Sequence, residues 1–358
     1  MPVYKDKNNG TWYVSARYVN WRGEHKQKCK RGFNTKREAQ EWERTFLQQS
    51  ASDLDMSFAA FVELYISDLK PRLKEYTWLT KKNIIESKIL PYFGKKNVNE
   101  ITPKDVIAWQ NELISYRDQR HRPYSRTYLK TIHNQLSAIL NHAVRFYDLK
   151  SNPAAKAGNM GVEEKKEMKF WTKEEYKRFS EAMMDKPVSF YAFEMLYWCG
   201  IRVGELLALT ADDFDFKKGI LRIDKSYHRI KGRDVVTTPK TRKSNRSIQM
   251  PKFLCEEMQE YISMIYGYEK GDRIFNISTS YLHHEMDRGA KEVDVQRIRI
   301  HDLRHSHVSL LIDMGFSALA IAERVGHESI EITYRYAHLF PSKQQEMARK
   351  LDYERMEE

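Results

Sequence analysis

Arg202 stands in a short segment whose composition suits anion binding. The segment, residues 200–205 (GIRVGE), places a glycine on either side of the arginine at a predicted junction between two helices. Backbone N–H groups are free at such a junction, and glycine permits a close approach. Glu205 lies three residues after Arg202 on the same helix face and could hold the guanidinium in one orientation. A helix start with an ordinary surface ion pair fits the same pattern.

A second arginine follows a histidine closely in residues 301–305 (HDLRH). Helical spacing puts His301, Arg304 and His305 on one face, which combines imidazoles with a guanidinium fork. Two histidines four residues apart are also typical of a zinc-binding helix. That motif needs a glutamate after the first histidine, where this chain has Asp302, and no third ligand is evident. We therefore expect no metal.

Residues 326–338 (GHESIEITYRYAH) could supply a nucleophile. A phenol with a pKa of about 10 is ionised to roughly one part in a thousand at neutral pH, so a reactive tyrosine needs cations or a base close by. The arginines and histidines of the other two segments could provide them. Tyr334 and Tyr336 would point about 200° apart on a helix, so only one can face such a site. A structural role for either tyrosine is the simpler alternative.

Residues 238–247 (TPKTRKSNRS) form a basic segment between predicted strands. Its composition is typical of a loop, and the flanking strands predict a β-hairpin with Lys240 at or near the tip. Such a basic loop can simply be solvated. Placed against DNA, Lys240 becomes a candidate proton donor, with Lys243 as the next candidate.

The chain that must position these residues has 358 residues, which suggests two or three domains. It has no apolar run near the ~18 residues of a membrane span, no secretory leader and three scattered cysteines, so we expect an intracellular protein. Most of the +12 net charge lies early. Residues 1–50 carry 11 basic and 5 acidic side chains, and residues 51–150 carry 16 and 11. This distribution favours a polyanionic partner, most simply nucleic acid.

Residues 1–50 are predicted to form a small β-rich unit. Alternating apolar residues predict a strand over 11–19, and 25–30 would return after a turn at 21–24. A capping box at Thr35 predicts a helix through Gln49. The sheet could lie in a DNA groove, or its face could simply be solvated. The candidate DNA contacts are Tyr13 and Arg17 on one face of the first strand, and Lys26, Lys28 and Lys30 on one face of the second.

Residues 55–150 are predicted to be wholly helical. Helices are expected over 58–69, 77–90 and 125–147, and another should begin at Pro103 after a Thr102 cap. Basic residues interleave with the apolar stripes and would give the bundle a positive face. The candidate DNA contacts here are Lys81, Arg126 and Lys130.

Residues 151–169 are small, charged and aperiodic, which predicts a linker. A mixed unit is expected over 170–345, followed by a tail at 346–358. A capping box at Thr172–Glu175 opens this unit, and strands over 219–224, 234–237 and 247–250 interrupt its helices. The predicted fold class is multidomain and mainly α with small β regions.

Taken in order, these segments resemble the tyrosine recombinases. GIRVGE, a lysine in the basic segment, HDLRH, GH at 326–327 and a tyrosine nine residues later occur in the order of that family. ITPKDV, LSAILNHAVR and the NPA that follows resemble its helical, SAM-like core-binding domain. YKDKNNGTWYVSARYV and GFNTKREAQEW resemble the AP2-like arm-binding domain of integrases from phages and integrative conjugative elements. The resemblance covers nearly the whole chain.

The resemblance implies the catalytic residues Arg202, Lys240, His301, Arg304, His327 and the nucleophile Tyr336, with Glu205 as support. The arginines would hold the non-bridging phosphate oxygens through bidentate contacts, which lysine could not reproduce. Lys240 would protonate the leaving 5′-oxygen. His301 would assist proton transfer at the nucleophile, and His327 would donate a hydrogen bond to the phosphate. Because a phosphotyrosine ester keeps the bond energy, no ATP, metal or other cofactor is implied.

The implied function is that of an integrase, which cleaves and rejoins DNA through a 3′-phosphotyrosine intermediate to integrate or excise a prophage or mobile element. The implied partners are double-stranded DNA at core and arm sites, an excisionase and a host DNA-bending protein. A homotetramer on DNA, and a monomer or weak oligomer when free, would act in the bacterial cytoplasm, bound to the nucleoid. Two alternatives are a type IB topoisomerase-like relaxing enzyme and a non-catalytic DNA-binding regulator.

Overall fold

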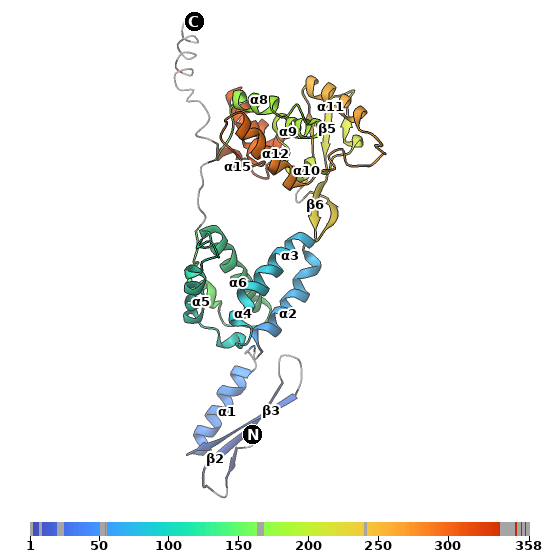
Figure 1. Cartoon of the computed structure of the whole chain (residues 1–358). Coiled ribbons are helices and arrows are strands. Elements are labelled where there is room, and N and C mark those ends of the chain that lie inside the picture. The colour runs from blue at the N-terminus through green and yellow to red at the C-terminus, as the bar shows by residue number, and fades with distance from the viewer. Residues whose placement is uncertain are drawn as a thin grey trace. The chain divides into compact units, whose positions relative to one another are not determined.

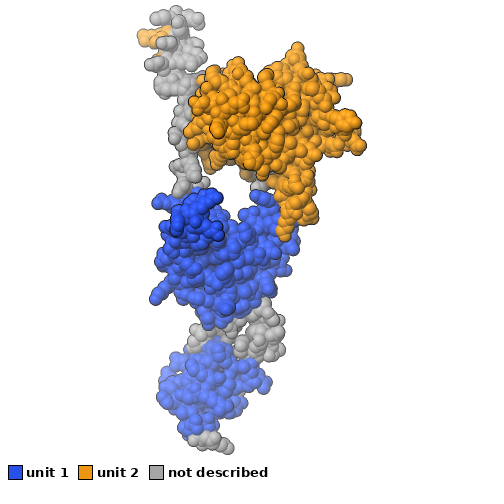
Figure 2. All heavy atoms as spheres, viewed as in Figure 1, with its two compact units in different colours: residues 1–165 blue, residues 166–358 orange. Residues whose placement is uncertain are grey.

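The computed structural model contains two compact units, residues 1–165 and 166–358 (Figure 2). The residues it describes are 3–6, 9–19, 25–50, 54, 56–162, 168–239, 242–336, 348, 352 and 355. Across these ranges, no helix has both the length and the apolar character that crossing a membrane requires.

A three-stranded antiparallel sheet and one helix form the N-terminal part of the first unit (Figure 1). Their bounds are β1 Val3–Lys5, β2 Trp12–Val19, β3 His25–Phe33 and α1 Lys36–Ser50. Both predicted strands and the helix are confirmed. The capping box is closed because the Glu38 N–H donates to Thr35 Oγ1 (3.2 Å) while Glu38 Oε2 accepts from the Thr35 N–H (3.3 Å). The turn predicted at 21–24 lies outside the described residues.

Helices joined by turns and loops form residues 58–157 in the same unit (Figure 1). Their bounds are α2 Phe58–Leu69, α3 Glu75–Ile84, α4 Leu90–Phe93, α5 Pro103–Ser115, α6 Arg126–Phe146 and α7 Pro153–Ala157. A wider helical turn, Ile85–Ile89, joins α3 to α4, so the single helix predicted over 77–90 is divided. Thr102 caps α5 with Pro103 as its first residue, as predicted.

Part of the predicted linker is folded. Asn152 caps α7 by accepting from the Ala154 N–H (2.8 Å), and its amide donates to Ser137 and Asn141 of α6. Ala154 is fully buried in the helical core. The composition of 151–169 hid this element because five residues are too few to show helical periodicity.

The second unit combines helices with short strands (Figure 1). Its helices are α8 Lys173–Glu181, α9 Pro187–Cys199, α10 Val203–Leu206, α11 Lys252–Met264, α12 Thr279–Glu292, α13 Asp302–Asp313, α14 Ala318–Val325 and α15 Ile330–Tyr334. Its strands are β4 Phe214–Asp215, β5 Ile220–Ile223, β6 Ser226–Ile230, β7 Arg233–Thr237 and β8 Arg246–Gln249. They form two antiparallel sheets, β4-β5-β8 and β6-β7. The capping box predicted at Thr172–Glu175 opens α8.

The sequence predicts a hairpin with Lys240 at or near its tip, but the hairpin of this unit turns at Lys231-Gly232. Both turn residues have positive φ, 49° and 81°, and β6 pairs with β7 on either side of them. The segment 238–247 instead leads from β7 to β8, which pairs with β5. The prediction was wrong because β6 was not recognised, so β7 and β8 were taken as partners. Lys240 itself lies outside the described residues.

Candidate active site

Arg202 is held at the junction of α9 and α10 by its own helix start. Gly200 ends α9 with φ 62°, and a Cβ there would meet His307 Cδ2 at 2.4 Å. Glu205 accepts from the backbone N–H of Arg202 (2.9 Å) and from its Nη1 (2.8 Å). This confirms the expected pairing. The Arg202 side chain stays 38% exposed, so part of its guanidinium remains available to a ligand.

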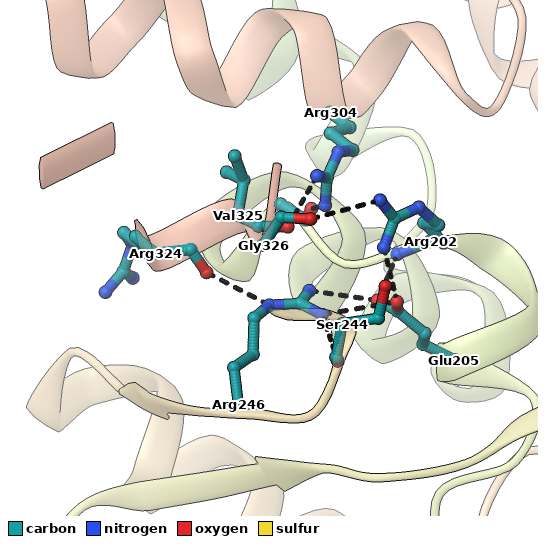
Figure 3. A network of polar contacts seen from close by, with 9 residues as sticks. Arg202, Glu205, Ser244, Arg246, Arg304, Arg324, Val325 and Gly326 are labelled. Carbon is teal, nitrogen blue, oxygen red and sulfur yellow. Dashed lines mark hydrogen bonds and ion pairs between the residues drawn. The ribbon is translucent and has the colours of Figure 1, made fainter. Parts of the chain in front are cut away.

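Arg246, which is not among the predicted site residues, holds the other side of the Glu205 carboxylate (Figure 3). Its Nη2 lies 2.9 Å from Oε2, and its Nη1 lies 3.2 Å from Oε1. The same guanidinium donates to the backbone carbonyls of Arg324 (3.1 Å) and Ser244 (3.2 Å). Burial raises the pKa of Glu205, but the two arginines more than offset it, so the carboxylate is charged. Arg246 therefore connects α10, β8 and the end of α14.

Arg304 reaches the same place from α13 (Figure 3). Its guanidinium donates to the carbonyls of Gly200 (2.8 Å) and Val325, while Arg202 Nη2 lies 3.4 Å from the Gly326 carbonyl. Burial, followed by the positive charges of Arg202 and Arg246, lowers the pKa of Arg304. Three guanidinium groups thus lie close together with a single carboxylate among them, and the net positive charge suits a phosphate diester.

Two of the predicted histidines contribute neutral imidazoles to this cluster. Burial lowers the pKa of His301 to about 4 and that of His327 to about 3, and the neighbouring arginines act in the same direction. His327 Nδ1 lies 2.8 Å from Thr333 Oγ1, which fixes its ring next to Gly326. At neutral pH both rings can donate a hydrogen bond without adding charge.

The two tyrosines lie in different environments. Tyr336 is 2% exposed, whereas Tyr334 is 55% exposed. The Tyr336 hydroxyl contacts Nδ1 of His305, a residue of the HDLRH segment that was not chosen as catalytic. Burial raises the pKa of Tyr336 to about 12, although the charge of Arg304 opposes this. The argument from helical spacing places both tyrosines within one helix. In the structure α15 ends at Tyr334, so Tyr336 lies beyond it.

The segment after Lys240 is anchored to the turn that carries His327. Lys243 Nζ donates to the Glu328 carbonyl (3.0 Å), so this lysine is engaged with backbone. Its own carbonyl and the Arg246 side chain lie over Gly326, where a Cβ would meet both at 2.9 Å. The basic segment and the GH turn therefore form one packed structure in the described residues.

We expect Gly326→Ala to weaken this packing. A left-handed φ of 68° costs an L residue about 1–2 kcal/mol, which corresponds to a Tm lower by about 3–6 °C for a unit of this size, and the new methyl must also displace Arg246. Gly315→Ala is the matched control because Gly315 has φ 85° but nothing within 4 Å of its Cβ position. Thermal unfolding should show the larger loss for Gly326→Ala. Equal losses would contradict the close packing of Arg246 on this turn.

The predicted DNA contacts of the N-terminal sheet divide between its two faces. In the β2–β3 register, Lys28 pairs with Ala16 and Lys30 with Val14, so these lysines share the face that α1 covers. Lys28 Nζ lies 5.3 Å from the Phe46 ring. Nothing is described of the Lys26 side chain. Lys28 and Lys30 therefore share one face of their strand, as predicted, but this is not the sheet face that carries Tyr13 and Arg17.

The opposite face of this sheet, which we call the open face, carries Tyr13 and Arg17. Tyr13 stacks on Tyr4 with ring centroids 5.3 Å apart, and Arg31 lies 5.4 Å from the Tyr13 ring centroid. Arg17 is exposed, and its cross-strand partner is Gln27. Arg31 was missed because a β-bulge at Trp12/Tyr13 shifts the register that aligns it with Tyr13.

The three predicted DNA contacts in the helices differ in their exposure and hydrogen bonding. Lys81 is half-buried and donates to Gln135 Oε1 of α6 (2.9 Å), and burial lowers its pKa. Arg126 is exposed at the start of α6, and Lys130, one turn later, is half-buried. All three residues remain predicted DNA contacts.

Comparison with known proteins agrees with this arrangement. Residues 2–50 match the family described as "Arm DNA-binding domain", 57–114 match "Phage integrase, N-terminal SAM-like domain", and 169–343 match "Phage integrase family". The chain is 32% identical over 347 residues to the ICEBs1 integrase of Bacillus subtilis (strain 168), which covers 89% of this chain and 90% of that protein.

Two solved structures share the fold at 18% identity. A fragment of the Tn1549 transposon integrase in complex with transposon right end DNA has a TM-score of 0.65 and covers 83% of this chain and 99% of that one. A lambda integrase tetramer bound to a Holliday junction has a TM-score of 0.58 and covers 93% and 94%.

Proposed function

This chain belongs to the phage integrase family of site-specific tyrosine recombinases, and we propose that it cleaves and rejoins DNA through a covalent bond between Tyr336 and a 3′-phosphate. The observation that carries this proposal is the meeting of Arg202 and Arg304 at the Val325–Gly326 turn. A buried tyrosine hydroxyl in contact with a histidine lies beside Arg304, whose charge acts on it.

The chemistry is a displacement at phosphorus in which positioning and charge do most of the work. The phenolic oxygen of Tyr336 bonds to phosphorus, the P–O5′ bond breaks, and a histidine of the 301–305 turn takes the tyrosine proton. Arg202 and Arg304 hold the non-bridging oxygens, whose negative charge grows in the transition state. His327 donates a neutral hydrogen bond to the phosphate. Lys240 gives its proton to the leaving 5′-oxygen, and attack by a 5′-hydroxyl reverses these steps without a cofactor.

The partners we propose follow from the division of the chain. Residues 1–50 bind arm sites through the open face, residues 55–150 bind core sites, and residues 170–345 carry out the chemistry. The lambda neighbour is a tetramer on a Holliday junction, and we expect this chain also to act as a homotetramer on DNA. An excisionase and a host DNA-bending protein would set the direction of recombination in the bacterial cytoplasm, with the protein held on the nucleoid.

A strand-exchange assay tests this function. The full-length protein is mixed with a nicked suicide duplex that carries the junction sequence of the element, and then with two intact attachment sites. We expect a protein–DNA adduct that withstands denaturant, and recombinant duplexes from the paired sites. Relaxation of supercoils without joining of two duplexes would instead identify a topoisomerase-like enzyme, and binding without any adduct would identify a regulator.

Lys240→Ala should be rescued by a better leaving group. General acids contribute about 100- to 10,000-fold to such steps, so cleavage of ordinary DNA should fall by a factor in that range. A substrate with a 5′-bridging sulfur needs no proton at the leaving atom and should be cleaved at close to the wild-type rate. Lys243→Ala is the comparison, because Lys243 is engaged with the Glu328 carbonyl. Sulfur rescue of Lys243→Ala in place of Lys240→Ala would transfer the role to Lys243.

Deleting residues 1–50 should separate arm binding from chemistry. We expect integrative recombination to be lost while cleavage of core-site DNA is largely kept. Salt should weaken binding of the full-length protein more steeply than binding of the truncated one, because the logarithmic slope is about −0.9 for each phosphate contact. The measurement is the binding constant against salt concentration for both proteins. An equal loss of core cleavage would contradict the modular assignment.

A further inference from the structure

The buried hydroxyl of Tyr336 contacts His305, one helical turn after His301. Nδ1 of His305 is within hydrogen-bond distance of Tyr336 Oη, and the two ring centroids lie 5.6 Å apart. Tyr336 is 2% exposed, and the His305 side chain is 16% exposed. Bulk water therefore reaches this pair poorly, and a protein group must take the phenolic proton.

The other nitrogen of His305 faces a fixed carboxylate. Nε2 lies 3.8 Å from Asp302 Oδ1, one turn back on α13. Asp302 is held in place by Arg299, whose Nη2 lies 2.7 Å from Oδ1 and whose backbone N–H lies 2.8 Å from Oδ2. This arrangement favours the tautomer with hydrogen on Nε2, which leaves the Nδ1 lone pair directed at the tyrosine hydroxyl.

His301 packs against the other histidine of this turn, His305. Its ring packs edge-on against His305, with centroids 5.1 Å apart and planes at 84°. Among the described residues, the hydrogen-bonding group on Tyr336 Oη is His305. The positions of these rings thus separate the roles of two histidines that the HDLRH pattern places on one helix face.

We propose that His305 is the residue that takes the proton of Tyr336 during DNA cleavage, with Asp302 as its positioning residue. This rests on the proposed function. The O–H bond of Tyr336 breaks and its proton moves to Nδ1 of His305, while the phenolic oxygen bonds to phosphorus and the P–O5′ bond breaks. The imidazolium that forms is stabilised by the Asp302 carboxylate. In the reverse reaction the same proton returns to Tyr336 as the 5′-hydroxyl attacks.

The charges around His305 leave it neutral before the reaction. The titratable or charged groups that face it are Asp302, Arg299, His301, Arg304, His327 and Tyr336. Burial lowers the pKa of His305 below its ordinary value, the two arginines act in the same direction, and Asp302 opposes them. At pH 7 a neutral imidazole therefore faces a phenol whose pKa burial raises to about 12. This is the protonation state that a proton acceptor requires.

His305→Asn tests the assignment, because an asparagine Oδ1 can accept the hydrogen bond but cannot take the proton. The single-turnover rate of adduct formation is measured with full-length protein at saturation on a nicked suicide substrate, from pH 6.5 to 9.5. The wild-type rate should be flat from about pH 7 upward, where the imidazole is neutral. The variant should be about 100-fold slower at pH 7, and its rate should rise about tenfold per pH unit, because hydroxide must then ionise the tyrosine.

His301→Asn on the same turn is the matched control. It should be slower than wild type but keep the flat pH profile. A rising profile in His301→Asn, or a flat one in His305→Asn, would overturn the assignment. If His305→Asn does not fold, His305→Gln is measured in the same way. Absence of any adduct with wild-type protein would be a failure of the proposed function, whereas a wild-type profile in the variant would be a failure of this inference alone.

Discussion

Tyr336→Phe is expected to form no covalent protein–DNA adduct, while its fold and DNA binding remain intact. The phenyl ring keeps the buried volume next to Val308, Ile312 and Val325, so the small core around it is preserved. The variant lacks the oxygen that contacts His305, and without that oxygen no bond to phosphorus can form. The measurement is adduct formation on a nicked suicide substrate, resolved on a denaturing gel, together with binding to the same DNA.

Tyr334→Phe is the matched control, two residues away. Its ring is 55% exposed, and its hydroxyl belongs to a different environment from that of Tyr336. We expect this variant to form the adduct at close to the wild-type rate. Proteolysis of the wild-type adduct followed by peptide mapping gives an independent answer. DNA found on Tyr334 would reverse the assignment of the nucleophile.

Elements set by local signals could be predicted from the sequence. The capping boxes at Thr35 and Thr172 and the cap at Thr102 place helix starts correctly, because each depends on contacts within four residues. The strand over 11–19 followed from alternation, since its apolar face must be buried. The pairing of Arg202 with Glu205 is equally local, at a spacing of three residues.

Pairing between distant segments could not be predicted in this way. β6 (SYHRI) has polar residues at three of five positions, and one of its two buried residues is its last, so its pattern is too short to reveal a strand. Without it, β7 was assigned to the wrong partner. In the N-terminal sheet, strand alternation gave the faces within each strand correctly. It did not give the cross-strand register, which places Lys28 and Lys30 on the helix side.

The candidate site also combines residues that local sequence indicates with residues whose roles depend on distant contacts. Types and order of residues brought out the arginines, the histidines and Tyr336, because each lies in a segment of unusual composition. Arg246 also lies in such a segment, where it begins β8, but its importance depends on contacts with Glu205 and the end of α14, far away in sequence. The one available signal was its place near the end of the basic segment 238–247. The choice between His301 and His305 required the positions of the rings, because both lie on one helix face.

Arg202→Lys is expected to retain DNA binding but to slow adduct formation about 100- to 1,000-fold. A single ammonium cannot span two phosphate oxygens, so one or two charge-assisted hydrogen bonds of about 1.5–3 kcal/mol each are lost in the transition state. The lysine keeps the positive charge beside Glu205, which should preserve the fold. The measurement is the single-turnover cleavage rate at saturating protein, with the binding constant for the same duplex as reference.

Arg288→Lys is the matched control for this substitution. Arg288 also pairs with a buried glutamate three residues away, Glu285, which is 7% exposed against 5% for Glu205. Its other ion pairs, with Asp185 and Glu292, lie outside the candidate site. Both substitutions therefore alter an arginine–glutamate ion pair in the second unit, but only Arg202 belongs to the candidate site. Slower cleavage in Arg202→Lys alone would place the loss in transition-state contacts. Equal slowing in both variants would show that general weakening of the unit, and not the geometry of Arg202, accounts for it.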